Sequence, residues 1–182
     1  MRKIFTLAIA LVASALISQS IAQTKMVGGA AMYPTKDIVD NAVNSKDHTT
    51  LVAAVQAAGL VETLKSAGPF TVFAPTNAAF NKLPAGTVET LVRPENKATL
   101  TKILTYHVLS GTYSYKAIKR AIKAGKGTAQ FTTVSGGKLW AMMKDKKIML
   151  KDENGGMAWV TIADVFQKNG VIHEINAVVT PK

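Results

Sequence analysis

The spacing of hydrophobic residues changes near position 125 of this 182-residue chain. Before that point, apolar residues recur three and four positions apart, which predicts helices. These helices are expected from Pro34, over 51–58, 60–67 and 87–92, from Pro94, and over 115–124. After that point, short apolar runs separated by glycines predict strands at 131–134, 139–143, 147–151, 159–163 and 171–179, which join earlier strands at 70–73 and 106–109. Helices that precede most of the strands favour an α+β fold.

One segment, Phe70 to Phe80, passes from a strand pattern to a helix pattern. Its first four residues are aromatic or β-branched, as in a buried strand. Pro75 lacks the N–H that would continue a sheet ladder, so the strand should stop there. Thr76 or Asn77 then offers a side-chain oxygen that caps the next helix. We expect this turn to lie at the centre of the core.

Three segments resemble the signature blocks of the fasciclin-type adhesion domain. Residues 71–80, Thr-Val-Phe-Ala-Pro-Thr-Asn-Ala-Ala-Phe, are similar to its first block. Residues 104–111, with Tyr-His at their centre, resemble its central block, and residues 169–176 resemble its closing block. The blocks occur in the family's order, and the resemblance extends over about residues 35–181. One departure is Asn176, where the family often carries Asp.

The resemblance implies both a fold and a function. The fold would be a wedge of two β-sheets packed beside a layer of short helices. The function would be non-catalytic adhesion or interaction with a cell-surface or extracellular-matrix protein or polysaccharide. In the family, the dipeptide that matches Tyr106 and His107 is implicated in receptor binding on animal cells, which makes these two residues binding candidates.

Polar residues also occur inside the apolar blocks. Thr76, Asn77, His173 and Asn176 are interpreted as structural residues of the motifs. The favoured interpretation of Asn77, His107 and His173 is that they are buried, hydrogen-bonded and form a network that joins the three blocks.

The N-terminus has the pattern of a targeting segment. Arg2 and Lys3 precede a short apolar run and the small residues Ser20-Ile21-Ala22. We expect residues 1–22 to be a signal peptide, 23–34 a flexible lead-in and 35–182 the fasciclin-like domain. The protein would then be periplasmic or extracellular, with no transmembrane segment. The chain contains no Cys, so disulfides are excluded.

The net charge of +11 is unevenly distributed. Residues 113–151 contain ten Lys or Arg and one acid, Asp145, which gives +9. The helix expected at 115–124 has Lys116, Lys119, Arg120 and Lys123 on its polar face, and Lys144, Lys146, Lys147 and Lys151 follow in a predicted hairpin. This segment is either an ordinary solvated surface or a docking surface for an anionic polymer or anionic envelope surface. No motif for sequence-specific nucleic-acid recognition accompanies it.

The sequence gives little support for catalysis. There is no Cys and no Gly-x-Ser-x-Gly motif, so a hydrolase is only the third interpretation. His173-Glu174 lacks the second His of a zinc-protease helix, because position 177 is Ala. No metal site and no cofactor are expected. The rival function is a carrier of a small apolar ligand, held between the helical layer and the sheets. Its pocket would be lined by Met142, Met143, Met149, Met157, Trp140 and Trp159.

Overall fold

The computed structural model describes residues 24–182, so the expected signal peptide at 1–22 lies outside the described residues. The helices in this part of the chain are α1 (Ile38–Ala42), α2 (Thr49–Ala58), α3 (Val61–Lys65), α4 (Asn77–Phe80), α5 (Thr87–Leu91), the 3-10 turn η1 (Pro94–Asn96), α6 (Lys97–Tyr106) and α7 (Tyr115–Ala124). The strands are β1 (Lys25–Val27), β2 (Ala30–Met32), β3 (Phe70–Pro75), β4 (Val108–Ser110), β5 (Thr128–Thr132), β6 (Lys138–Lys144), β7 (Lys147–Lys151), β8 (Met157–Gln167) and β9 (Gly170–Ile175). The α+β class is confirmed.

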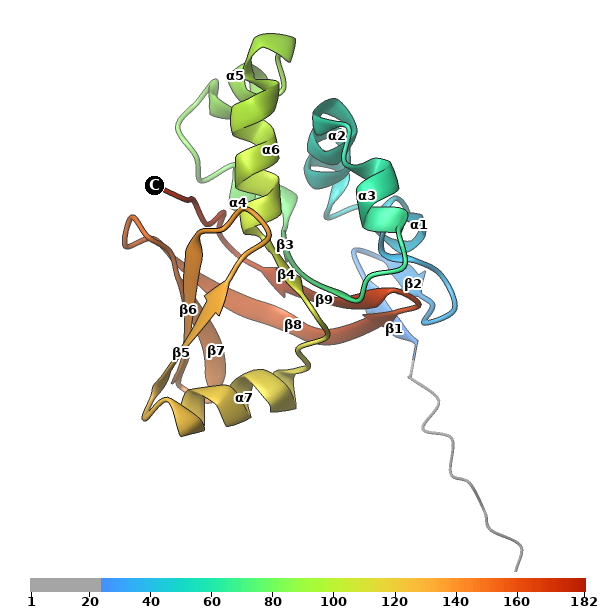
Figure 1. Ribbon diagram of the computed structural model, residues 1–182. Coiled ribbons are helices and arrows are strands. Elements are labelled where there is room, and N and C mark those ends of the chain that lie inside the picture. Colours follow the sequence, from blue (N-terminus) through green and yellow to red (C-terminus); the bar gives the residue numbers. More distant parts are fainter. Residues whose placement is uncertain (1–23) are drawn as a thin grey trace, which may run out of the picture.

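Seven strands form one mixed sheet in the order β4-β3-β9-β8-β7-β6-β5. The pair β3–β9 is parallel, and the other neighbours in this sheet are antiparallel. The long strand β8 pairs with β7 through Met157–Trp159 and with β9 from Val160 onward, with register shifts on both sides of Ile162. Such irregularities bend a strand. Figure 1 shows β5, β6 and β7 running across the direction of β8 and β9, which is the expected wedge.

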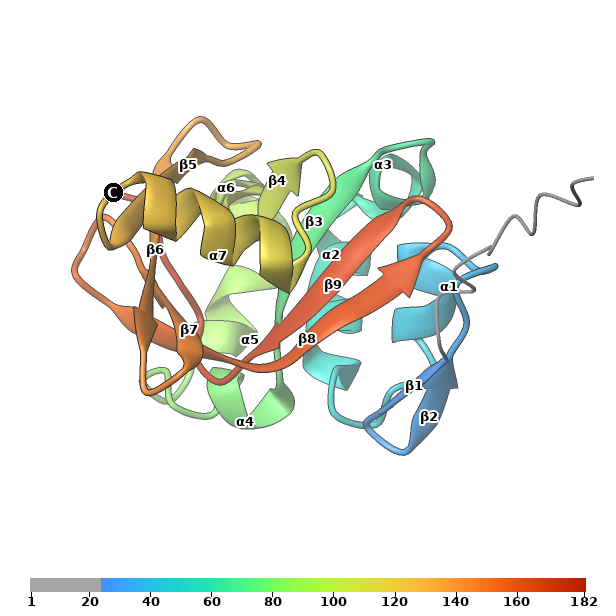
Figure 2. The same ribbon diagram turned by 90° about the horizontal axis from the view of Figure 1, so that it is seen from below.

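The central strand β3 is buried on both faces. Val72 and Ala74 belong to a core shared with α1, α2, α3 and α6, whereas Phe73 belongs to a second core inside the wedge. Ile118 and Ile122 of α7 close this second core. Figures 1 and 2 both place α7 on the opposite side of the sheet from α2 and α3. The strand therefore needs a continuous apolar sequence, as parallel strands covered on both faces do.

The turn after β3 forms as the sequence predicts. The strand ends at Pro75, and Thr76 is the N-cap of α4. The Ala79 N–H donates to the Thr76 hydroxyl oxygen at 3.2 Å, which satisfies one of the free donors at the helix start. Phe80 is buried against the helical layer.

Residues 24–34, which belong to the expected lead-in at 23–34, contain regular structure. Strands β1 and β2 pair as an antiparallel hairpin, and Gly28 and Gly29 form its turn with positive φ angles of 55° and 77°. Val27 and Met32 are buried in the core of the helical layer. The glycines thus serve a tight turn, for which residues without a Cβ are suited.

Several strand boundaries also differ from the sequence-based expectation: β5 spans Thr128–Thr132 rather than 131–134, and β8 extends over Met157–Gln167 rather than 159–163. The strand expected at 106–109 begins only at Val108, because α6 continues through Tyr106 and ends at His107. The last strand stops at Ile175 rather than near Val179. After it, the Asn176 N–H donates to the Trp159 carbonyl at 3.1 Å, and the chain leaves the sheet. None of the helices within residues 24–182 has the length and apolar character needed to cross a membrane.

Candidate functional site

The basic helix α7 is fixed to the wedge at both its start and its apolar side. Ser114 is its N-cap and accepts from the Ala117 N–H at 3.2 Å. The Tyr115 N–H donates to Asp164 Oδ1 at 2.6 Å, a charge-assisted bond at the positive end of the helix. Ile118 and Ile122 are buried. The helix is therefore held with its polar side toward solvent.

The cations predicted on that polar side are all exposed. They are Lys116, Lys119, Arg120 and Lys123. Among the described residues, the ion pairs involve His48, Lys65 and Arg93, and none includes a cation of α7. A helix face with four exposed cations and no acidic partner presents a positive potential to the solvent.

The hairpin of β6 and β7 brings further lysines close to α7. The Tyr115 hydroxyl donates to the Lys146 carbonyl oxygen at 3.0 Å, so the β6–β7 turn lies beside the start of the helix. In this turn Asp145 and Lys146 have φ angles of 49° and 60°, the left-handed pair of a tight hairpin turn. We define the basic face as the exposed residues Lys116, Lys119, Arg120, Lys123, Lys144, Lys146 and Lys147. Lys151 lies at the far end of β7.

Asn77 links two helices that are distant in sequence. Its Oδ1 accepts from the Thr50 N–H at 3.0 Å, and its Nδ2 donates to the Lys46 carbonyl at 2.9 Å and to Thr49 Oγ1 at 3.0 Å. The residue at the N-cap of α2, His48, makes no capping hydrogen bond with its own side chain. Asn77 therefore supplies the cap of α2 from outside the helix.

Tyr106 and His107 are buried inside the protein. Tyr106 is 0 % exposed and His107 is 2 % exposed. The Tyr106 hydroxyl donates to the Lys138 carbonyl and accepts from the Glu153 N–H, and burial raises the pKa of Tyr106 to about 12. A direct receptor contact by these side chains, which the resemblance implied, would require the core to open. We therefore assign them a structural role.

The other motif residues are also hydrogen-bonded. His173 Nδ1 accepts from the Asp164 N–H at 3.3 Å, its Nε2 donates to the Tyr113 carbonyl at 2.7 Å, and its ring stacks on Phe73. Asn176 Oδ1 accepts from the Trp159 N–H at 2.8 Å, a role that needs no charge.

Asn77, His107 and His173 are all hydrogen-bonded but do not bond to one another. His107 and His173 are buried as expected, whereas Asn77 is only partly buried. Each instead joins a different pair of segments. The single network predicted from the sequence is therefore replaced by three local links.

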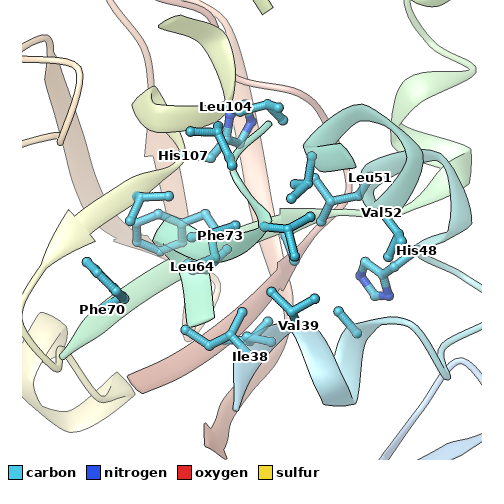
Figure 3. Close-up of a pocket in the computed structure, with 18 of the residues that line it drawn as sticks. Ile38, Val39, His48, Leu51, Val52, Leu64, Phe70, Phe73, Leu104 and His107 are labelled. Atoms are coloured by element: carbon cyan, nitrogen blue, oxygen red, sulfur yellow. The ribbon is translucent and has the colours of Figure 1, made fainter. Parts of the chain in front are cut away.

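A cavity lies between the helical layer and β3, where a carrier pocket was expected. Its walls are mostly aliphatic, and they come from α1, α2, α3 and α6 and from β1, β2, β3, β4, β8 and β9. Figure 3 shows Val39, Val52, Leu64 and Phe70 among the side chains around it. The Met and Trp residues expected to line such a pocket are elsewhere, because they lie on β6, β7 and β8.

Three ionisable side chains line this cavity, namely His48, His107 and Glu174. Sequence patterns did not pair His48 with Glu174. His48 Nε2 lies 3.9 Å from Glu174 Oε2, and both residues are buried. Burial lowers the pKa of His48 more strongly than the nearby Glu174 carboxylate raises it. The signal in the sequence was Glu174 itself, a charged residue in the buried strand β9. Within residues 24–182, no three potential metal ligands come together.

Comparisons with known proteins agree with this architecture. A family model described as "Fasciclin domain" matches residues 46–181. Protein sll1483 of Synechocystis sp. is 45% identical over 159 residues, which cover 87% of this chain and 81% of that protein. Immunogenic protein MPB70 of Mycobacterium bovis is 37% identical over 145 residues, which cover 77% of this chain and 66% of that protein.

The solved structure of a FAS1 domain pair from the insect cell adhesion molecule fasciclin I has the same fold. It superposes with a TM-score of 0.69 at 16% sequence identity. The match covers 80% of this chain and 51% of that one. Strand and helix arrangements are thus shared even where the sequences have diverged.

Proposed function

The chain belongs to the fasciclin domain family, and on that basis we propose that it is an exported, non-catalytic adhesion domain that binds anionic polymers through its basic face. Its partner would be an acidic polysaccharide or another anionic component of a cell surface, extracellular matrix or envelope. Its compartment would be the periplasm or the cell exterior. The adhesive part of this proposal draws on the insect cell adhesion molecule that shares the fold.

The observation that carries the proposal is the arrangement of α7. Its two buried isoleucines and its Ser114 cap hold the helix firmly, while its four cations have no acidic partner within the described residues. The lysines of the β6–β7 turn extend the same positive region, since Tyr115 bonds to Lys146. Exposed cations that are not paired within the protein are available to an external polyanion.

The rival explanation is that these cations only keep the surface solvated. A charge-neutralising variant tests it, in which Lys116, Lys119, Arg120 and Lys123 are all changed to Gln. The matched control changes Lys46, Arg93, Lys97 and Lys168 to Gln, which removes the same charge from exposed positions outside α7. Both proteins would be passed over immobilised polygalacturonate at low salt.

We expect the α7 variant to lose most of its retention and the control to keep it, with equal thermal stability for both. Attraction between exposed charges acts over about 8 Å at physiological salt, so the position of the cations should matter as well as their number. If both variants lost retention equally, retention would depend on the net charge of the protein and not on the position of the cations. Retention of the α7 variant at the wild-type level would reject the basic face as the adhesive surface.

A further inference from the structure

Adhesion through α7 leaves the cavity between the helical layer and β3 without a role. Its volume is about 110 Å³, somewhat smaller than the roughly 150 Å³ apolar cavity that takes up benzene. None of its lining residues belongs to α7. Because α7 lies on the other side of the sheet (Figures 1 and 2), a ligand in this cavity would not touch the basic face.

One buried ring nitrogen of the cavity wall has no hydrogen-bond partner among residues 24–182. The His48 side chain is fixed through Nδ1, which lies 2.8 Å from the Ser45 hydroxyl oxygen. Its Nε2 is buried and has no partner at full hydrogen-bond geometry within the described part of the chain, although the nearby Ala74 backbone acts to raise the pKa of His48. The whole residue is only 3 % exposed. A buried polar atom without a partner costs about 1–3 kcal/mol, so a partner from outside the chain would be stabilising.

The Glu174 carboxylate, a hydrogen-bond acceptor, lies near His48 Nε2 in the cavity wall. Glu174 Oε1 accepts from the Thr161 hydroxyl at 2.6 Å, which fixes the carboxylate. Its other oxygen, Oε2, is 3.9 Å from His48 Nε2, too far for a direct hydrogen bond. An oxygen atom placed on the cavity side of the line that joins them would lie about 2.8 Å from each and could bridge the two groups. The pair thus presents one N–H donor and one carboxylate acceptor to the same small volume.

We propose that this cavity binds a small neutral molecule with an apolar body, about the size of one six-membered ring, and a single hydroxyl group. The hydroxyl oxygen accepts from His48 Nε2, and its proton is donated to Glu174 Oε2. The aliphatic walls, among them Val39, Val52 and Leu64, surround the apolar body (Figure 3). Phenols and short cyclic alcohols have this chemistry.

The lowered pKa of His48 agrees with this geometry. Burial keeps the imidazole neutral near pH 7. We assign the proton to Nε2 because this nitrogen faces the Glu174 carboxylate, so Nδ1 accepts from the Ser45 hydroxyl. In that form Nε2 can donate to a neutral hydroxyl.

The test compares phenol with benzene, which has the same ring and no hydroxyl. Binding to the purified protein would be followed by changes in its methyl NMR signals. We expect saturable binding of both probes, with phenol about tenfold tighter, the ratio that corresponds to one hydrogen bond. His48→Phe keeps a ring but removes the donor, and it should abolish the preference for phenol. His48→Gln, which retains an N–H donor, should restore part of it.

A second pair of variants shows whether the probes enter this cavity. Val52→Phe places a ring among the lining residues and should weaken the binding of both probes. Val43→Phe is the control, because it makes the same change at an exposed position that does not line the cavity, and it should leave binding unchanged. Wild-type NMR dispersion would verify that each variant folds. The proposal would be overturned if neither probe bound saturably. It would also be overturned if the wild-type protein bound phenol no more tightly than benzene, as His48→Phe is expected to do. The result is independent of retention on polygalacturonate.

Discussion

His107 is held as a neutral imidazole by both of its ring nitrogens. Its Nδ1 donates to the Ile103 carbonyl at 2.9 Å, and its Nε2 accepts from the Val179 N–H at 3.2 Å. Burial lowers its pKa to about 4, against the weaker opposing effects of the Ile103 bond and the Asp152 charge. Burial also lowers the pKa values of His48 and His173. All three histidines of the chain therefore favour the neutral form in the folded state.

This predicts a loss of stability in mild acid. The unfolded chain takes up protons near pH 6.5, whereas the folded chain does so only at lower pH, so the unfolded state binds more protons between these values. The free energy of unfolding should be flat above pH 6.5. As the pH falls from 6.5 toward 4, it should decrease by about 1.4 kcal/mol per pH unit for His107 alone.

Urea titrations at a series of pH values measure this slope. His107→Gln removes one titrating group. The slope of its free energy of unfolding against pH should therefore be shallower by the contribution of one proton, about 1.4 kcal/mol per pH unit, whatever the stability of the variant at pH 7. An unchanged slope in this variant would contradict the assignment of His107 as a neutral buried imidazole.

At the level of elements, α2 and α4 are joined by Asn77, which caps a helix to which it does not belong. Asn77→Ala removes the acceptor for the Thr50 N–H and the donor to the Lys46 carbonyl. We expect it to lower the free energy of unfolding by about 1–2 kcal/mol, the usual effect of losing an N-cap. Chemical denaturation would measure the change. The control is Asn81→Ala, since Asn81 is exposed and its side chain makes no hydrogen bond within residues 24–182. Equal effects of the two substitutions would argue against the capping role.

Elements whose signal is local could be predicted from the sequence. The helix at 115–124, the strand at 147–151 and the Thr76 cap have the predicted positions, because periodicity and capping chemistry act over a few residues. The β1–β2 hairpin was missed, since its three-residue strands are stabilised by burial of Val27 and Met32 against distant segments. Tyr106 was assigned to a strand, although packing in the wedge extends α6 over it.

The cavity was predicted in place but not in composition. Its location followed from the expected layers of the fold, whereas its walls depend on which side chains face inward. The polar pair His48–Glu174 joins residues 126 positions apart, a contact that no local pattern encodes. The same limit applies to the basic face, since the sequence placed four cations on one helix but could not place the β6–β7 turn beside it.

For the whole molecule, the distribution of charge predicts how adhesion responds to salt. The +9 of residues 113–151 contrasts with −2 over residues 152–182, so the field of the protein is strongly asymmetric. Binding to a linear polyanion releases roughly one counterion for each cation that contacts it, and the logarithm of affinity then falls linearly with the logarithm of salt concentration. The slope of that line counts the contacting cations.

Single substitutions should therefore divide the lysines into two groups. Lys119→Gln, in the centre of α7, should reduce the salt slope for polygalacturonate by about one. Lys151→Gln removes the same charge at the far end of β7, away from the turn that Tyr115 contacts, and should leave the slope unchanged. Titrations at several salt concentrations would measure both slopes. If the two variants shift the slope equally, the polyanion follows the net charge of the protein, and the basic face defined here has no special role in adhesion.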